Sequence, residues 1–321
     1  MSEQPLERYR AWFADSLHPR VRGWCSDAVE RRLAEAQAQF QLRTTSDEHS
    51  RRYAALCPVA GVDHHLYRLR ELSLPGGASA IAGIHFRGRA TAFPFVGVFA
   101  LSRWLSSEEA AAAHAALMRE FAVFSPRASR WWAPSEAHAP KLASARADLH
   151  LVMGSLAEIR SAPAPALPGH WKLRRIESAS KVGGAFTELY RSFHTARPDL
   201  AEAVPPSSLD DLELCAKAEG LYACFSGTEV VGVVAAQPVA QYAVQAWLMW
   251  DIVLARQYCG QGLAPVLQRA VLDRLDPARA PLVAGTIDAA NLPSLRSALR
   301  VGRQVVGTWT FIDGRSERAG S

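Results

Sequence analysis

The chain has 321 residues, of which 49% are hydrophobic and 21% are charged, and its formal net charge is +5. This composition excludes a disordered chain, and the length favours two domains over one. The positive charge forms no dense block, which argues against a nucleic-acid partner and suits an anionic small molecule. Five cysteines without a CxxC pair favour a reducing, cytoplasmic location. They argue against a disulfide framework or a zinc site, and we expect no metal.

The first half of the sequence predicts an α/β domain. Ser106 followed by Glu108 and Glu109 is typical of a helix start, because serine caps the first turn and acidic residues favour its positive end. Predicted helices cover 6–42 with a break near Pro19, 106–121 and 139–147; predicted strands cover 78–86, 93–101, 128–133 and 149–153; residues 44–50 form a predicted loop.

A proline-rich segment divides the chain. Residues 161–169 contain Pro163, Pro165 and Pro168 among small residues, which is typical of a linker. We therefore predict an N-terminal α/β domain over 1–160 and a second domain over 170–315.

The second half predicts a strand, two helices, a β-hairpin, a long strand, and then alternating helices and strands. One run, residues 230–250, carries no charge, and it suits either a membrane span or two strands joined by a turn. Pro238 and three glutamines interrupt this run, so we favour the strands and expect no membrane partner. Predicted strands cover 171–176, 221–225, 230–236, 246–254, 282–287 and 304–312; predicted helices follow Ser178, Ser208, Gly262 and Asn291.

The segment Cys259-Gly260-Gln261-Gly262-Leu263-Ala264 lies between the long apolar strand and an amphipathic helix pattern. Glycines let the backbone approach a phosphate closely. The first N–H groups of a helix have no partner within the helix, and the helix dipole attracts negative charge. The segment is therefore predicted to bind a pyrophosphate.

This loop, the strand order and a helix from Asn291 to Gly302 together resemble the GCN5-related N-acetyltransferase (GNAT) superfamily over residues 171–312. The resemblance implies a mixed central sheet flanked by helices, acetyl-CoA as donor, and direct attack of an amine on the thioester. It implies that main-chain groups of one strand and an asparagine contact the pantetheine arm, and that the loop backbone holds the pyrophosphate. The implied binding residues are Ile252, Val253, Leu254, Cys259, Gly260, Gln261, Gly262, Leu263, Ala264 and Asn291.

The first half has the same order of strands and helices, but Arg103-Trp104-Leu105 replaces the glycine loop. Two hypotheses remain open: a degenerate GNAT copy that binds no cofactor, or an unrelated α/β domain. Tandem members of the superfamily have a similar length and similarly unequal halves. This resemblance favours a small-molecule primary amine as acceptor, and a homo-oligomer is compatible with it.

Two positions depart from the family pattern. Cys259 replaces the Arg or Gln that leads the loop, and Ala298 replaces a Tyr that protonates the leaving thiolate in many members. An alternative function is therefore a non-catalytic protein that binds or senses CoA. Cys259 at a helix N-terminus is also predicted to have a lowered thiol pKa.

Three side chains are candidate catalytic groups. Asp251 is the one charged residue between Glu229 and Arg256, so burial is expected to raise its pKa and suit it as a base for the amine. The alternatives for Asp251 are a structural pair with a nearby Arg and an exposed strand end. His194 is a second candidate base, or an exposed surface residue. Tyr242 is a candidate acid, or a packing residue of a strand.

Overall fold

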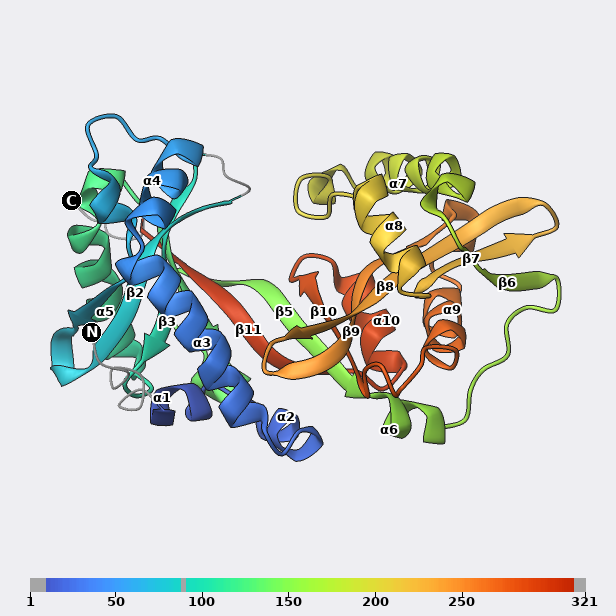
Figure 1. The fold of residues 1–321 in the computed structure, drawn as a ribbon, viewed down its shortest axis with the longest axis horizontal. Helices are drawn as coiled ribbons and strands as arrows, with labels where there is room; N and C mark the ends of the chain where they lie inside the picture. The colour runs from blue at the N-terminus through green and yellow to red at the C-terminus, as the bar shows by residue number, and fades with distance from the viewer. Residues whose placement is uncertain (1–9, 88–90, 315–321) are drawn as a thin grey trace. The chain divides into compact units, whose positions relative to one another are not determined.

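The computed structural model describes residues 10–87 and 91–314 (Figure 1), and the chain forms two compact units. Unit 1 comprises residues 1–149 and 306–321, and unit 2 comprises residues 150–305. Two strands, β5 (Ala145–Ser155) and β11 (Gln304–Asp313), contribute residues to both units.

Unit 1 contains a mixed sheet with the strand order β1-β2-β3-β4-β11. Strands β3 and β4 are parallel, and the other neighbouring pairs are antiparallel. Its strands are β1 (Arg70–Ser73), β2 (Ser79–Phe86), β3 (Pro94–Leu101) and β4 (Ala128–Ala133), and its helices are α1 (Arg10–Asp15), α2 (Pro19–Trp24), α3 (Ala28–Thr45), α4 (Asp47–Leu56) and α5 (Ser107–Glu120).

Alternating side chains of β2 give unit 1 a core on each face of its sheet. Ala82 and Ile84 pack with Leu117 of α5, and Ile81 packs with Phe13 of α1. All five of these side chains are fully buried. Helices therefore cover both faces, as expected for an α/β domain.

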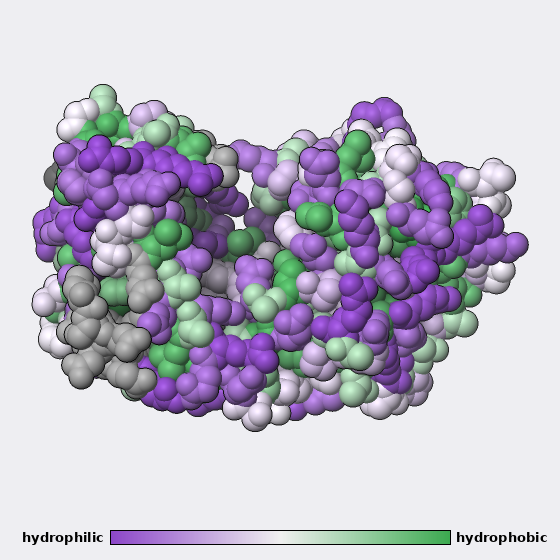
Figure 2. Space-filling view, in the orientation of Figure 1, coloured by the Kyte–Doolittle hydropathy of each residue, from purple (hydrophilic) through white to green (hydrophobic). Residues whose placement is uncertain are grey.

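Unit 2 contains the strand order β6-β7-β8-β9-β10-β5. In Figure 1, α7 and α8 lie above this sheet, and α9 and α10 lie below it. Its other strands are β6 (Trp171–Arg175), β7 (Leu221–Ser226), β8 (Glu229–Gln241), β9 (Val244–Leu254) and β10 (Leu282–Asp288), and its helices are α6 (Leu156–Ser161), α7 (Gly183–Ala196), α8 (Leu209–Lys217), α9 (Leu263–Leu272) and α10 (Leu292–Arg300). On the face drawn in Figure 2, hydrophobic residues of this unit are scattered among hydrophilic ones.

The uncharged run of 230–250 forms the antiparallel pair β8 and β9, which confirms the two predicted strands. The turn between them is Tyr242-Ala243, and both residues have positive φ angles, 58° and 69°. None of the helices in the described part of the chain is long and apolar enough to cross a membrane.

Two local predictions in the first half are wrong. The predicted loop at 44–50 contains the start of α4, where the Ser46 side chain accepts a hydrogen bond from the His49 N–H and caps the helix. The predicted helix at 139–147 does not form, because Ala145 already begins β5. Sheet pairing overrides the helix propensity of the alanines there. The predicted helix start at Leu6 lies outside the described residues.

The compact units differ from the predicted division in two places. The predicted linker, 161–169, lies within unit 2, where Arg269 Nη2 of α9 donates hydrogen bonds to the carbonyls of Arg160 and Ala162, at 3.0 and 2.9 Å. The last strand was expected in the C-terminal domain, but residues 306–313 pack as part of unit 1. There β11 pairs antiparallel with β4.

The two units repeat one arrangement of strands. In unit 1, residues 95–97 of β3 pair in parallel with 128–130 of β4; in unit 2, residues 246–248 of β9 pair in parallel with 282–284 of β10. Within the described residues, no further pairs join the two strands in either unit, although all four strands continue.

A β-bulge follows at the same distance in both units. Phe99 of β3 is skipped in the pairing with β2, and Trp250 of β9 is skipped in the pairing with β8. Each residue lies two positions after the last parallel pair. This shared irregularity supports the hypothesis that the first half is a degenerate copy of the second, because unrelated sheets have no reason to share it.

Candidate active site

The glycine loop of unit 2 has the backbone that the sequence predicts. Gly260 and Gly262 have φ angles of +76° and +75°, a conformation that side chains strongly disfavour. A Cβ atom at either position would meet no atom within 4 Å, so the space beside both glycines is open. The Gln261 side chain crosses the loop and donates to the Gln257 carbonyl at 2.6 Å. The loop is therefore shaped and accessible for an anionic group.

Helix α9 begins without a side-chain cap. Its N-cap residue is Gly262, which has no side chain to accept a hydrogen bond from the first turn. The first N–H groups of the helix therefore remain available to a ligand, and the helix dipole adds to their attraction for negative charge. This geometry supports the predicted pyrophosphate cradle at 259–264.

Strand β9 offers a free edge next to this loop. On one edge, Ile252, Val253 and Leu254 pair with residues 232–234 of β8. On the other edge, the described part of β10 pairs with β9 only as far as Leu248. An extended ligand can thus pair with the main chain of 249–254 as an additional strand would, as was predicted for the pantetheine arm.

Asp251 lies at this opening, directly after the bulged Trp250. Its side chain is 3% exposed, and Oδ1 accepts a hydrogen bond from the Tyr190 hydroxyl on α7. Its other oxygen, Oδ2, is buried and has no hydrogen bond of standard geometry among the described residues, although the hydroxyl and the N–H of Ser207 lie close enough to the carboxylate to favour its charged form. No basic residue in the described part of the chain forms an ion pair with Asp251, which leaves the predicted structural ion pair unsupported.

Burial raises the pKa of Asp251 above its ordinary value of 3.8. Hydrogen-bonding groups of Ser207 and Tyr190 favour the charged form and act against this shift, but burial is the larger effect. The predicted rise is therefore confirmed in direction and cause. A carboxylate that is desolvated and has an unpaired oxygen is suited to accept a proton.

Tyr190 was not among the predicted site residues, and it connects two of them. Its hydroxyl contacts Asp251, and its ring packs against the His194 ring at a centroid distance of 5.6 Å. Burial, and then the charge of Asp251, raises the pKa of Tyr190. The signal in the sequence was the spacing: residues 190 and 194 lie one turn apart on α7, on the face that packs against the sheet.

His194 is half-buried, so it is not the exposed surface residue of the alternative reading. Its Nε2 lies 2.9 Å from the Val204 carbonyl, to which it donates a hydrogen bond. The thiol of Cys215 on α8 is also close to Asp251: burial, followed by the charges of Asp251 and Asp211, raises the pKa of Cys215 to about 12. Asp251, Tyr190 and His194 therefore form one cluster.

Tyr242 lies apart from that cluster. It belongs to the two-residue turn after Gln241, not to a strand, and its φ angle is 58°. Asp251 lies seven positions after Val244, which is next to the turn, and this corresponds to roughly 23 Å along an extended strand. The structure does not bring Tyr242 together with the other candidate catalytic groups.

Asn291 and Ala298 have structural roles in α10. Asn291 is the N-cap, and its Oδ1 accepts a hydrogen bond from the Ser294 N–H at 3.3 Å. Its amide group still has donors for a ligand. Ala298 is 1% exposed and packs with Val152 and Ile287, so the position of the family's tyrosine is part of the apolar core.

The prediction of a lowered pKa for Cys259 is wrong. Burial raises the pKa of its thiol, and the opposing effect of Arg256 is smaller. Cys259 precedes the N-cap Gly262 by three residues and ends a short 3₁₀ helix. Its Sγ points back to the carbonyls of Leu254 and Ala255, at 3.8 and 3.7 Å. It therefore does not experience the positive end of α9 as the sequence suggested.

One cluster in unit 1 has the residue types of a metal site. Possible ligand atoms of Asp47, His64 and His65 lie within 4.8 Å of one another. However, Arg51 Nε and Arg68 Nη2 bind the same Asp47 carboxylate, at 2.6 and 2.8 Å. Two guanidinium groups repel a cation and occupy the acceptor positions, so we interpret the cluster as an ion-pair network.

Comparison with known proteins agrees with this geometry. Residues 185–302 match the family described as acetyltransferase (GNAT) family, and unit 2 therefore contains a GNAT domain. The resemblance predicted from the glycine loop and the Asn291 helix is confirmed. No curated protein matches the chain.

One solved structure shows that the similarity of fold extends beyond this domain. The structure of a GCN5-related N-acetyltransferase from Sphaerobacter thermophilus has a TM-score of 0.52 and 16% identity, and the match covers 87% of this chain and 91% of that one. It therefore extends into unit 1. A GCN5-related N-acetyltransferase from Kribbella flavida has a TM-score of 0.43 and 13% identity, with 88% and 95% covered. A tandem GNAT protein from the clavulanic acid biosynthesis pathway has a TM-score of 0.44 and 13% identity, with 84% and 95% covered.

Proposed function

We propose that unit 2 transfers an acetyl group from acetyl-CoA to a primary amine of a small molecule. The observation that carries the proposal is the position of Asp251. This buried carboxylate lies where β9 separates from β10. It belongs to the free strand edge that leads to the glycine loop. One ligand that spans the loop and the strand edge would thus place its reactive end beside a base.

The residues of the loop and of β9 would hold acetyl-CoA. The backbone of 259–264 would bind the pyrophosphate, and main-chain groups of Ile252, Val253 and Leu254 would pair with the pantetheine amides. Asn291 would donate to the same arm from the start of α10. Bound acetyl-CoA supplies a thioester whose carbonyl carbon an amine attacks, with the C–S bond breaking and the thiolate leaving.

Asp251 would accept the proton that the amine must lose, at Oδ2. Tyr190 holds the carboxylate through Oδ1, which leaves Oδ2 for the substrate. Because burial raises its pKa, Asp251 is a stronger base than an exposed carboxylate. His194, which packs on Tyr190, would line the acceptor side of the site.

The base assignment is tested by the pH dependence of acetyl transfer. Free-thiol release with a panel of amines is measured for the unaltered protein and for Asp251→Asn. We expect kcat/KM to fall as the pH decreases through the pKa of Asp251, on a limb that lies above 3.8, and we expect Asp251→Asn to lose at least about 100-fold in rate. A variant with full activity and the same acid limb would exclude Asp251 as the base.

The cradle is tested by placing negative charge in it. Gly262→Glu adds bulk and charge at a positive φ, and we expect it to abolish acetyl-CoA binding in calorimetry. The matched control is Gly227→Glu, because Gly227 in the β7–β8 turn also has a positive φ, +62°, and also borders open space. Retained binding in Gly262→Glu, or equal loss in Gly227→Glu, would contradict the cradle.

A non-catalytic CoA-binding protein is the second candidate, and the buried Ala298 favours it, because the usual acid is replaced by a methyl group of the core. It predicts acetyl-CoA binding that Gly262→Glu abolishes, without thiol release for any amine of the panel. The two assays above therefore distinguish both functions.

A further inference from the structure

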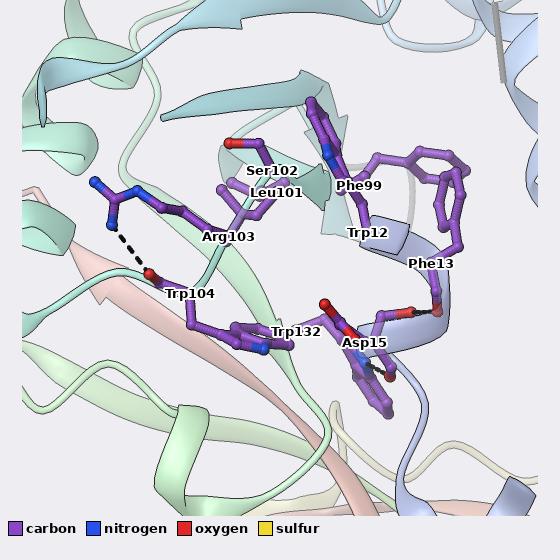
Figure 3. A pocket seen from close by; sticks show the side chains of 12 residues that line it. Trp12, Phe13, Asp15, Phe99, Leu101, Ser102, Arg103, Trp104 and Trp132 are labelled. Carbon is purple, nitrogen blue, oxygen red and sulfur yellow. Dashed lines mark hydrogen bonds between the residues drawn. The ribbon is translucent and has the colours of Figure 1, made fainter. Parts of the chain in front are cut away.

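Unit 1 contains a pocket at the position equivalent to the free edge of β9 in unit 2, which we propose to bind acetyl-CoA. It lies past the last parallel pair of β3 and β4, Gly97 with Arg130, where the two strands separate. Its cavity has a volume of about 30 Å³ and opens to solvent. Figure 3 shows that α1, the end of β3 and β4 surround it.

Five of the twelve residues that line the pocket are aromatic. They belong to three different parts of unit 1: Trp12 and Phe13 of α1, Phe99 and Trp104 at the end of β3 and just after it, and Trp132 of β4. Phe13 and Phe99 meet edge to face with their ring centroids 5.8 Å apart. Trp132 Nε1 donates to the Ser16 carbonyl at 2.8 Å, which fixes its ring beside α1. The wall is therefore held in place before any ligand binds.

The charge of the pocket is negative. Arg103 borders the pocket, but its guanidinium group points away from the rings in Figure 3 and binds the Glu109 carboxylate, at 2.6 Å for the closest pair. Its charge is thereby neutralised. Asp15 is exposed at the rim, and among the described residues it forms no ion pair or hydrogen bond. Arg32 lies over the Phe13 ring, 5.7 Å from its centroid, but pairs with Glu35, so Asp15 is the charged side chain of the pocket lining that has no ion-pair partner among the described residues.

The features that suit unit 2 for a phosphate-bearing donor are missing here. The N-terminus of α5 is closed by a capping box in which the Ser106 side chain binds the Glu109 N–H and the Glu109 carboxylate binds the Ser106 N–H. A carboxylate therefore occupies the position that would attract a phosphate. Ala100, one residue after the bulge, stands where Asp251 stands in unit 2.

We propose that this pocket binds a small organic ammonium ion. The faces of aromatic rings carry negative potential, so they attract a cation with an apolar covering, and quaternary ammonium groups are recognised in this way. Asp15 supplies the counter-charge at the rim. Without the carboxylate, the same rings would suit any apolar ligand. The negative charge of Asp15 therefore favours a cationic ligand over a neutral one.

The test compares two probes of equal shape on the full chain. Choline carries a trimethylammonium group, and 3,3-dimethyl-1-butanol is its neutral analogue. Binding is followed by tryptophan fluorescence and by calorimetry. We expect saturable binding of choline and at least about tenfold weaker binding of the neutral alcohol. No saturable binding of choline, or equal affinity for both probes, would overturn the proposal.

Variants locate the site. We expect Asp15→Asn to weaken choline binding about tenfold and Trp104→Leu to weaken it further, whereas Asp15→Glu retains it. Asp210→Asn, an exposed aspartate of unit 2, is the matched control and should have no effect. Undiminished binding in Asp15→Asn would also overturn the proposal. The readout does not involve acetyl transfer, so its outcome is independent of the function proposed for unit 2.

Discussion

At the scale of single residues, the environment of a side chain decides its chemistry more than its position in the sequence does. Asp251 and Cys259 were both predicted to have perturbed pKa values. For Asp251 the apolar neighbours in the sequence were sufficient, because they are also its neighbours in the strand. For Cys259 the prediction failed, because burial of its thiol against the preceding 3₁₀ turn raises the pKa more than Arg256 lowers it.

The raised pKa of Asp251 implies a cost in stability. The folded protein binds the proton more tightly than the unfolded chain, so the free energy of unfolding falls as the pH rises from 3.8 toward the folded-state pKa, and the loss persists above it. Asparagine removes this cost and still accepts a hydrogen bond from Tyr190. We expect Asp251→Asn to melt at a higher temperature than the unaltered protein at pH 7.

The control for this prediction is a second pH. Below 3.8 both side chains are neutral, so the two melting temperatures should converge, as scanning calorimetry would show. A variant that is less stable than the unaltered protein at pH 7 would mean that the Tyr190 hydrogen bond outweighs desolvation. The combination of greater stability with lower activity is typical of catalytic groups.

At the scale of elements, helix starts separate the two units. Helix α9 begins at a glycine and leaves its first N–H groups to a ligand, whereas α5 satisfies its own through Ser106 and Glu109. Arg103 lowers the pKa of Glu109 to about 2, so the carboxylate of the cap stays charged at neutral pH. A self-sufficient helix start suits a structural domain, and an incomplete one suits a binding site.

The cap of α5 gives a prediction for unit 1. Ser106→Ala removes the side chain that binds the Glu109 N–H and should lower the free energy of unfolding by about 1 kcal/mol. Ser107→Ala changes the same residue type one position later, where no capping bond is made, and should have little effect. Denaturant unfolding measures both, and equal effects would show that the cap does not stabilise α5.

Most elements of unit 2 follow from the sequence, since each has a local signal: alternation in the strands, Ser208 and Asn291 as caps, and Gly220 and Gly302 as stops. The signal for α4 was also local, Ser46 before Asp47 and Glu48, but it was read as a loop. The false helix at 139–147 differs, because residues 139–144 form a loop and 145–147 begin β5, whose pairing depends on strands distant in sequence. Tyr190 was missed because its partner, Asp251, is distant in sequence.

At the scale of the whole molecule, unit 1 is discontinuous in sequence. Its strand β4 pairs with residues 308–313 of β11, the last strand of the chain. No pattern within the first half indicates a missing strand, because the strand that completes its sheet follows the entire second unit. The predicted boundary at residue 160 therefore could not anticipate this exchange.

Removal of residues 306–321 tests the importance of that strand. The truncated chain loses the partner of β4, so we expect the amides of β3 and β4 to lose protection in hydrogen exchange. Unit 2 retains all of the residues proposed to bind acetyl-CoA, and its affinity should stay within about threefold of the original value. Full protection of β4 in the truncated chain would show that β11 is dispensable for unit 1.

The position of β11 also affects the order in which the protein is made. The ribosome synthesises residues 10–149 before residues 308–313. Until residues 308–313 have been synthesised, the edge of β4 that is not paired with β3 has no partner strand. Unit 2 can close earlier, because its residues, 150–305, are continuous in sequence. We therefore expect the nascent first half to keep an open sheet edge during translation, where it is exposed to pairing with other chains.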